Sequence, residues 1–257
     1  MRPDHIVCVT GDTRVDIPLT AVFDVGVGSV PPALREFFDD SVTIAYVKNE
    51  RRQTVVLEAR AESMETFRTI LFRCLLTGKP ARVRYPAKRG GHVLDTGYES
   101  GRLVIEQNDL TIQRSGGDLS IDLASVTTFS SERERIGDED CPLIAVGFLE
   151  KGTVVSARIM PEDERVLSLL SRYLKLEYTR VRNEVARLDL DEAVLQTLVA
   201  LDAGATEVEG MVPSVDDADE LLDHLQAIAL ITPHDEGYQL TRRGRIAATT
   251  HLESVNS

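Results

Sequence analysis

Runs of apolar and polar positions follow the same order at two places about a hundred residues apart. Each place shows an apolar run, a polar turn, a second apolar run and an amphipathic segment, at 43–47, 48–52, 54–57 and 62–77 and again at 143–147, 150–152, 153–155 and 161–178. Ile-Ala and Thr-Val-Val recur at nearly the same separation, and the following segments share Leu71, Arg73 and Leu75 with Leu170, Arg172 and Leu174. A repeat of this length predicts two copies of one module, a β-hairpin followed by a helix.

Further short strands are predicted around both hairpins, because turn residues bound the apolar runs there. These runs lie at 5–10, 14–17, 20–27, 98–106, 109–113, 118–122 and 126–131. The remaining segments are interpreted as one helical turn, a linker or first strand, and a charged loop, at 33–38, 79–91 and 133–140.

A bent sheet or small barrel closed by one C-terminal amphipathic helix is the pattern of a pleckstrin-homology-like domain. In the second copy, the apolar stripe that would close the sheet consists of Val166, Leu169, Leu170, Tyr173 and Leu174.

The pattern changes after residue 188, where helical periodicity replaces strand alternation. Helices are predicted over 191–203, with Gly204 at the C-terminal cap, over 207–211, and over 215–229, with Ser214 at the N-terminal cap. Two short strands at 230–232 and 238–241 precede a basic helix start at 242–244, the order of a winged helix-turn-helix. The sequence thus predicts an α+β protein, with pleckstrin-homology-like β modules over 1–78 and 79–188, the second ending in a long helix, and a winged-helix domain over 189–257.

The formal net charge of −13 over 257 residues is large, and arginine outnumbers lysine. Acidic surfaces keep proteins soluble in a salt-saturated cytoplasm, which favours a halophilic archaeal source. An acidic protein from a GC-rich organism is the alternative. Either way the acidity argues against a nucleic-acid partner, since phosphate contacts need clustered cations.

No apolar run is long enough to cross a bilayer, and the first residues lead directly into a strand-like run without a signal peptide. We therefore expect a cytoplasmic protein without a membrane span. Cys8, Cys74 and Cys141 are scattered, so we expect buried free thiols rather than a disulfide or a metal site.

Catalytic motifs are missing from the sequence, including HExxH, the P-loop, GxSxG and paired CxxC. The Gly-rich run at 25–28 lacks the third glycine and helix of a phosphate site, and the five histidines are not at ligand spacing. We expect no enzyme, no cofactor and no metal, although an enzyme with an unrecognised site stays an alternative.

Two charged clusters are candidate partner-binding sites. The first is five cations without an acid within eleven positions, Lys79, Arg82, Arg84, Lys88 and Arg89. Arg82 and Arg84 would share one strand face, and the cluster would attract an acidic partner. Alternatively, these cations balance carboxylates between the two β modules. The second cluster, on the helix predicted over 215–229, is Asp216, Asp217, Asp219, Glu220 and Asp223.

A winged helix also raises the hypothesis of a DNA-binding transcription regulator with an N-terminal sensory or scaffold region. The helix that would read bases carries the acidic cluster, which phosphates would repel. Only Arg242, Arg243 and Arg245 would be left to bind DNA. We interpret the domain as protein-binding or structural, with a solvated acidic face as the alternative.

The layout as a whole resembles the archaeal taxis adaptor family CheF. The resemblance covers about residues 5–250 and rests on the duplicated hairpin–helix units and on Tyr-x-Leu-Thr-x-x-Gly at 238–244. It implies a non-enzymatic adaptor in chemotaxis and phototaxis, linking the phosphorylated response regulator CheY to the archaellum switch proteins by protein–protein contact. It supplies no catalytic residues and leaves open whether the chain forms a homodimer.

Overall fold

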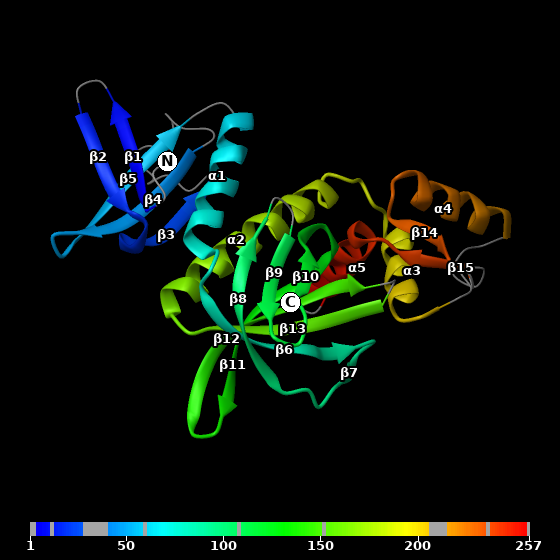
Figure 1. Ribbon diagram of the computed structural model, residues 1–257. Coiled ribbons are helices and arrows are strands. Elements are labelled where there is room, and N and C mark those ends of the chain that lie inside the picture. Colours follow the sequence, from blue (N-terminus) through cyan, green and yellow to red (C-terminus); the bar gives the residue numbers. More distant parts are fainter. Residues whose placement is uncertain are drawn as a thin grey trace.

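The protein combines strands and helices in a mixed α+β arrangement (Figure 1). The structure is a computed structural model, and it describes residues 4–10, 13–27, 41–58, 61–106, 109–150, 153–205, 215–234 and 237–255. Three predicted features lie outside the described residues. They are the helical turn at 33–38, the helix at 207–211, and Ser214, the N-terminal cap of the helix predicted over 215–229.

Among its described residues, the N-terminal region holds two small antiparallel sheets and one α-helix. A two-stranded sheet consists of β1 (His5–Thr10) and β2 (Thr13–Pro18). A three-stranded sheet has the order β3 (Val22–Val27), β4 (Ser41–Lys48) and β5 (Arg51–Glu58). The helix α1 (Ala61–Leu76) follows, so the hairpin and helix predicted for the first copy are both present.

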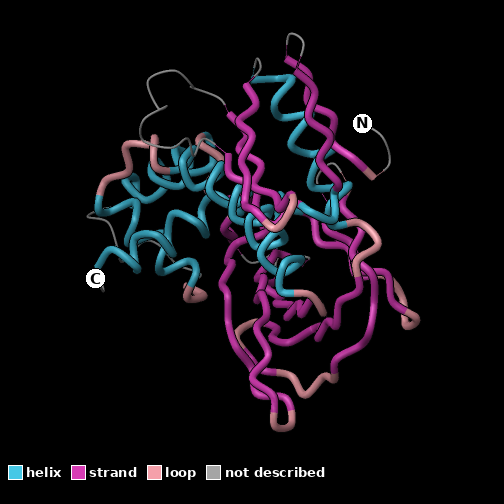
Figure 2. The backbone as a smooth tube through the Cα atoms, turned by 90° about the vertical axis from the view of Figure 1, so that its left-hand side faces the viewer, coloured by secondary structure: helices cyan, strands magenta, loops and turns pink. Residues whose placement is uncertain are grey.

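The middle region is one antiparallel sheet in the order β10-β9-β8-β6-β13-β12-β11, with β7 beside β6. Its strands are β6 (Pro80–Arg89), β7 (His92–Val93), β8 (Tyr98–Ile105), β9 (Asp109–Arg114), β10 (Leu119–Asp122), β11 (Val126–Ile136), β12 (Glu139–Glu150) and β13 (Thr153–Pro161). The helix α2 (Glu164–Val185) follows and lies across the inner face of the sheet (Figure 2). The segment interpreted as a linker or first strand is therefore a strand, and it is central to the sheet.

The C-terminal region consists of α3 (Glu192–Asp202), α4 (Val215–Ala227), β14 (Ile231–His234), β15 (Gly237–Leu240) and α5 (Arg242–Val255). The side chain of Asp191 accepts a hydrogen bond from the Val194 amide at 2.8 Å, which caps the start of α3. Gly204 follows that helix at φ 95°, a conformation that glycine adopts at little cost.

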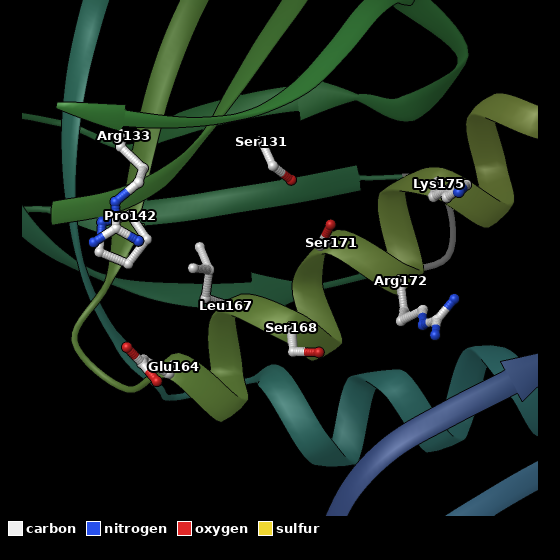
Figure 3. A pocket seen from close by; sticks show the side chains of 9 residues that line it. All are labelled: Ser131, Arg133, Pro142, Glu164, Leu167, Ser168, Ser171, Arg172 and Lys175. Atoms are coloured by element: carbon white, nitrogen blue, oxygen red, sulfur yellow. The ribbon is translucent and has the colours of Figure 1, made fainter.

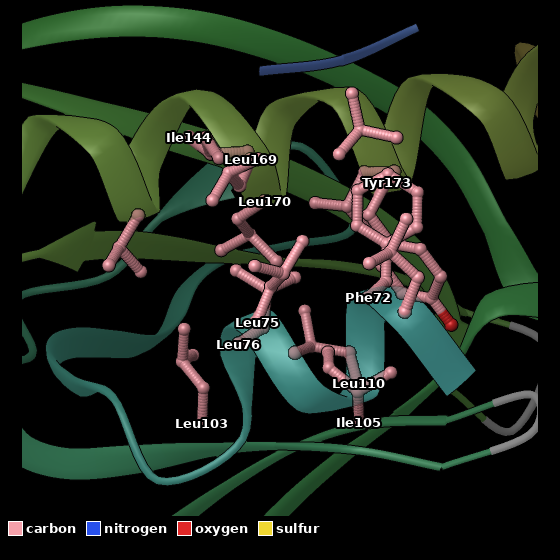
Figure 4. Packing of buried hydrophobic residues seen from close by; sticks show 14 of the residues in the cluster. Phe72, Leu75, Leu76, Leu103, Ile105, Leu110, Ile144, Leu169, Leu170 and Tyr173 are labelled. Atoms are coloured by element: carbon pink, nitrogen blue, oxygen red, sulfur yellow. The ribbon is translucent and has the colours of Figure 1, made fainter. Parts of the chain in front are cut away.

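The apolar stripe of α2 holds the regions together. Val166, Leu169, Leu170, Tyr173 and Leu174 are all buried, as predicted. They pack in one core with residues of α1, of the large sheet (Figure 4) and of the two N-terminal sheets. That core is continuous from Ile6 to Leu174. Further along α2, Val181 and Val185 belong to a second core, shared with α3 and α5. One helix thus contributes to both hydrophobic cores.

Arginines of α2 add polar links to the N-terminal strands. The Arg165 guanidinium donates from one nitrogen to the carbonyl oxygens of Leu19, Thr20 and Val22 at 2.7–3.0 Å. Arg172 pairs with Asp24 of β3 at 3.1 Å. These bonds satisfy backbone groups where the chain enters β3, and they fix the first region against the second.

The predicted charged loop at 133–140 is wrong, because β11 runs on to Ile136 and β12 begins at Glu139. Arg133 of β11 donates to the carboxylate of Asp140, a diagonal neighbour on the partner strand, at 2.5 Å. Residues 132–135 are all charged and show no apolar alternation, so the sequence pattern did not indicate a strand there.

The repeat predicted the order of elements but not their register. Ala45 pairs with Thr54 in the first hairpin, whereas Ala145 pairs with Arg158 and Thr153 pairs with Glu150 in the second. The two Thr-Val-Val triplets therefore occupy different places, because the second hairpin has longer strands. The shared leucines of α1 and α2 are buried in both helices.

The motif at 238–244 has a steric basis at its glycine. The Thr241 hydroxyl donates to the Ala229 carbonyl at 2.8 Å and accepts from the Gly244 amide at 3.2 Å, which starts α5 beside the end of α4. A Cβ atom at Gly244 would overlap the carbonyl oxygen of Leu230. Glycine is required there by the close approach of two backbones.

We expect Gly244→Ala to lower the free energy of unfolding by about 1–3 kcal/mol, the usual effect of overpacking. At an open helix position the same change would stabilise the helix by about 1 kcal/mol. Denaturant unfolding measures whether the free energy of unfolding falls or rises. Gly97→Ala is the matched control, because a Cβ there meets nothing within 4 Å. A neutral or stabilising Gly244→Ala would contradict the steric explanation.

Candidate functional site

The five predicted cations lie on or beside β6, and the strand alternates as expected. Ala81 and Val83 are buried, while Arg82 and Arg84 project from the opposite face. The prediction that these two arginines share a strand face is confirmed. The structure does not leave all five available, however, because several are bound by neighbouring carboxylates.

Arg84 belongs to a network on the outer face of the sheet. Its guanidinium donates to Glu134 at 3.3 Å and to the Leu94 carbonyl at 2.8 Å, and its side chain is only 16% exposed. Glu134 also accepts from Tyr98 at 2.7 Å and from Arg158 at 2.8 Å. Arg84 therefore serves a structural role, and its partner carboxylate lies in the same sheet rather than in the first module.

The charges of this network shift two pKa values. Burial alone would raise the pKa of Glu134, but the hydrogen bond from Tyr98 and the guanidinium groups of Arg158 and Arg84 outweigh it, so the pKa is lowered. Burial, and then the bond to Glu134, raises the pKa of Tyr98. The carboxylate stays ionised and the phenol stays protonated, which preserves the donor and acceptor roles in the network.

Arg89 forms a similar but more exposed contact at the other end of β6. It donates to Glu150 at 2.6 Å, and the Tyr85 hydroxyl donates to the second oxygen of that carboxylate at 2.5 Å. Burial, followed by the bond to Glu150, raises the pKa of Tyr85 to about 12. Arg84 and Arg89 thus fit the alternative in which the cations balance carboxylates.

The other three cations are bound less fully. Arg82 has its guanidinium 3.1 Å from the Met160 sulfur and lines a hollow beside Pro142 and Leu167. Lys88 is exposed at the rim of another hollow. Within the described part of the chain, no ion pair involves Lys79 or Lys88. The predicted patch is therefore one strand with two structural arginines and three more accessible cations.

The acidic cluster lies on α4, at a distance from β6 along the molecule (Figure 1). Asp219, Glu220 and Asp223 are exposed, whereas Ala218 and Leu225 of the same helix are buried. Asp216 and Asp217 fall within the first turn of α4. The helix therefore presents a negatively charged outer face, and the structure does not bring the two predicted clusters together.

The three arginines considered for DNA make contacts within the protein. Arg242 donates to the Val126 carbonyl of β11 at 2.8 Å, Arg243 donates to the Ile228 carbonyl at 3.3 Å, and Arg245 donates to the Asp202 carboxylate at 2.5 Å. These bonds dock α5 against the large sheet, α4 and α3. They give the arginines a structural role without DNA.

A groove between α2 and β11 was not found from the sequence. We call it the α2–β11 groove, and three elements line it. The lining residues are Ser131 and Arg133 of β11, Pro142 of β12, and Glu164, Leu167, Ser168, Ser171, Arg172 and Lys175 of α2. Its volume is about 460 Å³. Ser131 and Ser171 point into the gap from opposite walls (Figure 3). The serines that interrupt the apolar pattern of α2 are its sequence signal. On the facing strand, Ser131 was predicted to end a strand, but Arg133 had been interpreted as part of a loop.

The described ranges contain no cluster of three or more His, Cys, Asp and Glu side chains suited to a metal ion. None of the described helices is long and apolar enough to span a bilayer. Cys141 is buried, and Cys8 and Cys74 are half-buried free thiols; burial raises the pKa of the Cys8 thiol.

A family model described as archaeal chemotaxis signal transduction system protein F matches residues 1–180, more than half of the chain. The chain belongs to this CheF family. The match includes both hairpin–helix modules and most of α2. A role in chemotaxis signalling follows, and the family resemblance stated from the sequence is confirmed.

Two relatives from Halobacterium salinarum support this assignment. The chain is 33% identical to taxis protein CheF2 over 259 aligned positions, covering 100% of this chain and 90% of the relative. It is 24% identical to taxis protein CheF1 over 231 positions, covering 85% of this chain and 77% of the relative. Nothing in these relatives' names points to DNA binding, and the CheF family is described as a signal transduction family rather than as an enzyme family.

The lowered pKa of Glu134 predicts a pH-dependent contribution to stability. Its stabilising effect is fully present above the unfolded value of about 4.3 and is lost as the pH falls through the lower folded value. We expect Glu134→Gln to lower the free energy of unfolding by about 1 kcal/mol at neutral pH. Denaturant unfolding between pH 7 and pH 3 should show the difference from wild type shrinking below about pH 4.

The exposed Glu106→Gln variant controls for the general effect of removing a carboxylate. A Glu134→Gln difference that stays constant over this pH range would contradict the role assigned to the ionised carboxylate.

Proposed function

We propose that this CheF-family protein is a non-enzymatic cytoplasmic adaptor that links the phosphorylated response regulator CheY to the switch proteins of the archaellum. Family membership is the observation that carries the proposal. An adaptor must hold two partners at a fixed separation. The helix α2 supports such a role, because it contributes to both hydrophobic cores and so connects the strand regions with the C-terminal helices.

We further propose that residues 79–188 form a pleckstrin-homology-like domain and that residues 189–257 form a winged helix. The first strand of the large sheet pairs with both its second and its last long strands, β8 and β13, and a C-terminal helix closes the sheet. That bent closure is the arrangement expected of a pleckstrin-homology-like domain. The helices and the β14–β15 hairpin of the C-terminal region support the winged helix. Residues 1–78 would form a smaller pleckstrin-homology-like module.

We also propose which charged residues contact the partner proteins. Lys79, Arg82 and Lys88 are the cations that could meet an acidic partner, since Arg84 and Arg89 already bind carboxylates. On α4, away from β6, the exposed Asp219, Glu220 and Asp223 would bind a basic surface of a second partner. Opposite charges on separate surfaces would favour two different partners.

Affinity purification of the tagged chain in a buffer with molar KCl should recover the response regulator and the archaellum switch proteins. Recovery of the regulator should rise when it is activated with beryllofluoride, a mimic of the phosphoryl group. Quantitative mass spectrometry against an untagged strain provides the measurement. Lys88→Glu should reduce the recovery of one partner, and Lys48→Glu, at another exposed lysine, serves as its control.

Failure to recover either partner, with the tagged chain folded and abundant, would contradict the adaptor function. Unchanged recovery with Lys79→Glu, Arg82→Glu and Lys88→Glu would remove the β6 cations from the proposal and leave the adaptor function standing.

A further inference from the structure

The two edges of the large sheet differ in length and in protection. β10 ends one side with four residues, and β11 ends the other with eleven. Short edge strands resist pairing with another chain, whereas long ones present a row of unpaired backbone groups. Among the described residues, no strand pairs with the outer edge of β11. This edge can therefore accept a further strand.

The α2–β11 groove lies along this edge. Side chains alternate along β11, so that Phe129 packs on the core, Ser131 and Arg133 line the groove, and Glu132 and Glu134 project to the outer face, where they pair with Arg158. The segment 128–131 carries no charge. Residues 132–135 of β11 are all charged, and charge on an edge strand discourages pairing, so the uncharged segment 128–131 is the part of this edge that is open to a further strand.

The dimensions suit a short extended peptide. The α2 wall runs from Glu164 to Lys175, about 16 Å at 1.5 Å per residue. An extended chain rises about 3.3 Å per residue, so roughly five residues would fill the groove. A second hollow, which shares Pro142, Glu164 and Leu167, continues it toward Arg82 of β6.

The charges of the groove set the polarity of its occupant. Arg133 forms an ion pair with Asp140, and Arg172 forms one with Asp24. The positive charge of each arginine is therefore partly balanced and attracts a ligand less strongly. Lys175 is exposed, and no ion pair within the described residues engages it. In a chain of net charge −13, such a lysine favours an acidic side chain at its end of the groove.

We propose that the α2–β11 groove binds an extended segment of a protein partner, which adds to the free edge of β11 as a further strand. Main-chain hydrogen bonds to β11 would supply affinity. A small apolar residue against Leu167 and Pro142, and an acidic residue at Lys175, would supply specificity. This surface rests on the proposed adaptor function, because it is the way in which one partner docks.

Purified activated CheY and purified archaellum switch proteins, each titrated separately by calorimetry in molar KCl, are the probes. Ser168 is exposed, so Ser168→Trp fills the groove without disturbing the core. We expect this variant to weaken the binding of one probe at least about tenfold, a loss of about 1.4 kcal/mol. Lys175→Glu should weaken the same probe. Ser120→Trp, on the β10 edge, and Lys48→Glu are the matched controls and should bind as wild type does.

Amide hydrogen exchange tests the added strand directly. Binding should slow exchange in peptides that cover 128–135 of β11, because outward-facing amides gain partners. Circular dichroism and thermal unfolding establish that each variant is folded. Should Ser168→Trp fail to fold, Lys175→Glu and hydrogen exchange on the wild type still test whether a partner binds in the α2–β11 groove.

The outcomes separate the two proposals. Wild-type binding that both variants retain, with unchanged exchange in β11, would overturn the groove and leave the adaptor function intact. No wild-type binding to either probe would overturn the adaptor function itself. Slowed exchange in β11 that depends on protein concentration without a probe would assign the edge to a second copy of this chain, against the partner segment.

Discussion

Burial of one face of α2 is the interaction on which the rest of the structure depends. The stripe from Val166 to Leu174 fills the concave side of the large sheet, and Val181 and Val185 continue the same helix into the C-terminal core. Full burial of a leucine or valine side chain is worth about 1.5–3 kcal/mol, so this one helix supplies a large share of the apolar stabilisation. Its polar face carries serines and charged residues, of which Arg165 and Arg172 bind the N-terminal strands.

The placement of charge follows from the same constraint. Side chains that point away from α2 on β6, β11 and β13 cannot enter the core, and they form ion pairs across the strands instead. Glu134 shows this best, since it accepts from Tyr98, Arg84 and Arg158 at once. Exposed pairs contribute little to stability, whereas a half-buried network of this kind also fixes side-chain positions. Two of the five cations predicted to bind a partner are thus already engaged.

Most elements could be predicted from the sequence, because their apolar periodicity reports burial directly. The stripe of α2, the hairpin at β4 and β5 and the shared strand face of Arg82 and Arg84 all follow from spacing alone. The extension of β11 to Ile136 could not be predicted, since its charged residues resemble a loop until their cross-strand partners are known. The α2–β11 groove was missed for the same reason: a groove needs two walls, and the part of β11 that carries Arg133 had been interpreted as a loop.

The Arg165 contacts have a consequence for any attempt to divide the molecule. One guanidinium nitrogen of α2 binds the carbonyl oxygens of Leu19, Thr20 and Val22, which come from the opposite end of the sequence. If proteolysis near residue 78 were followed by separation of the two fragments, those carbonyls and the apolar side of β3 would lose their cover. The two fragments would then be expected to stay associated after cleavage, as a nicked complex, rather than to separate into freely soluble halves.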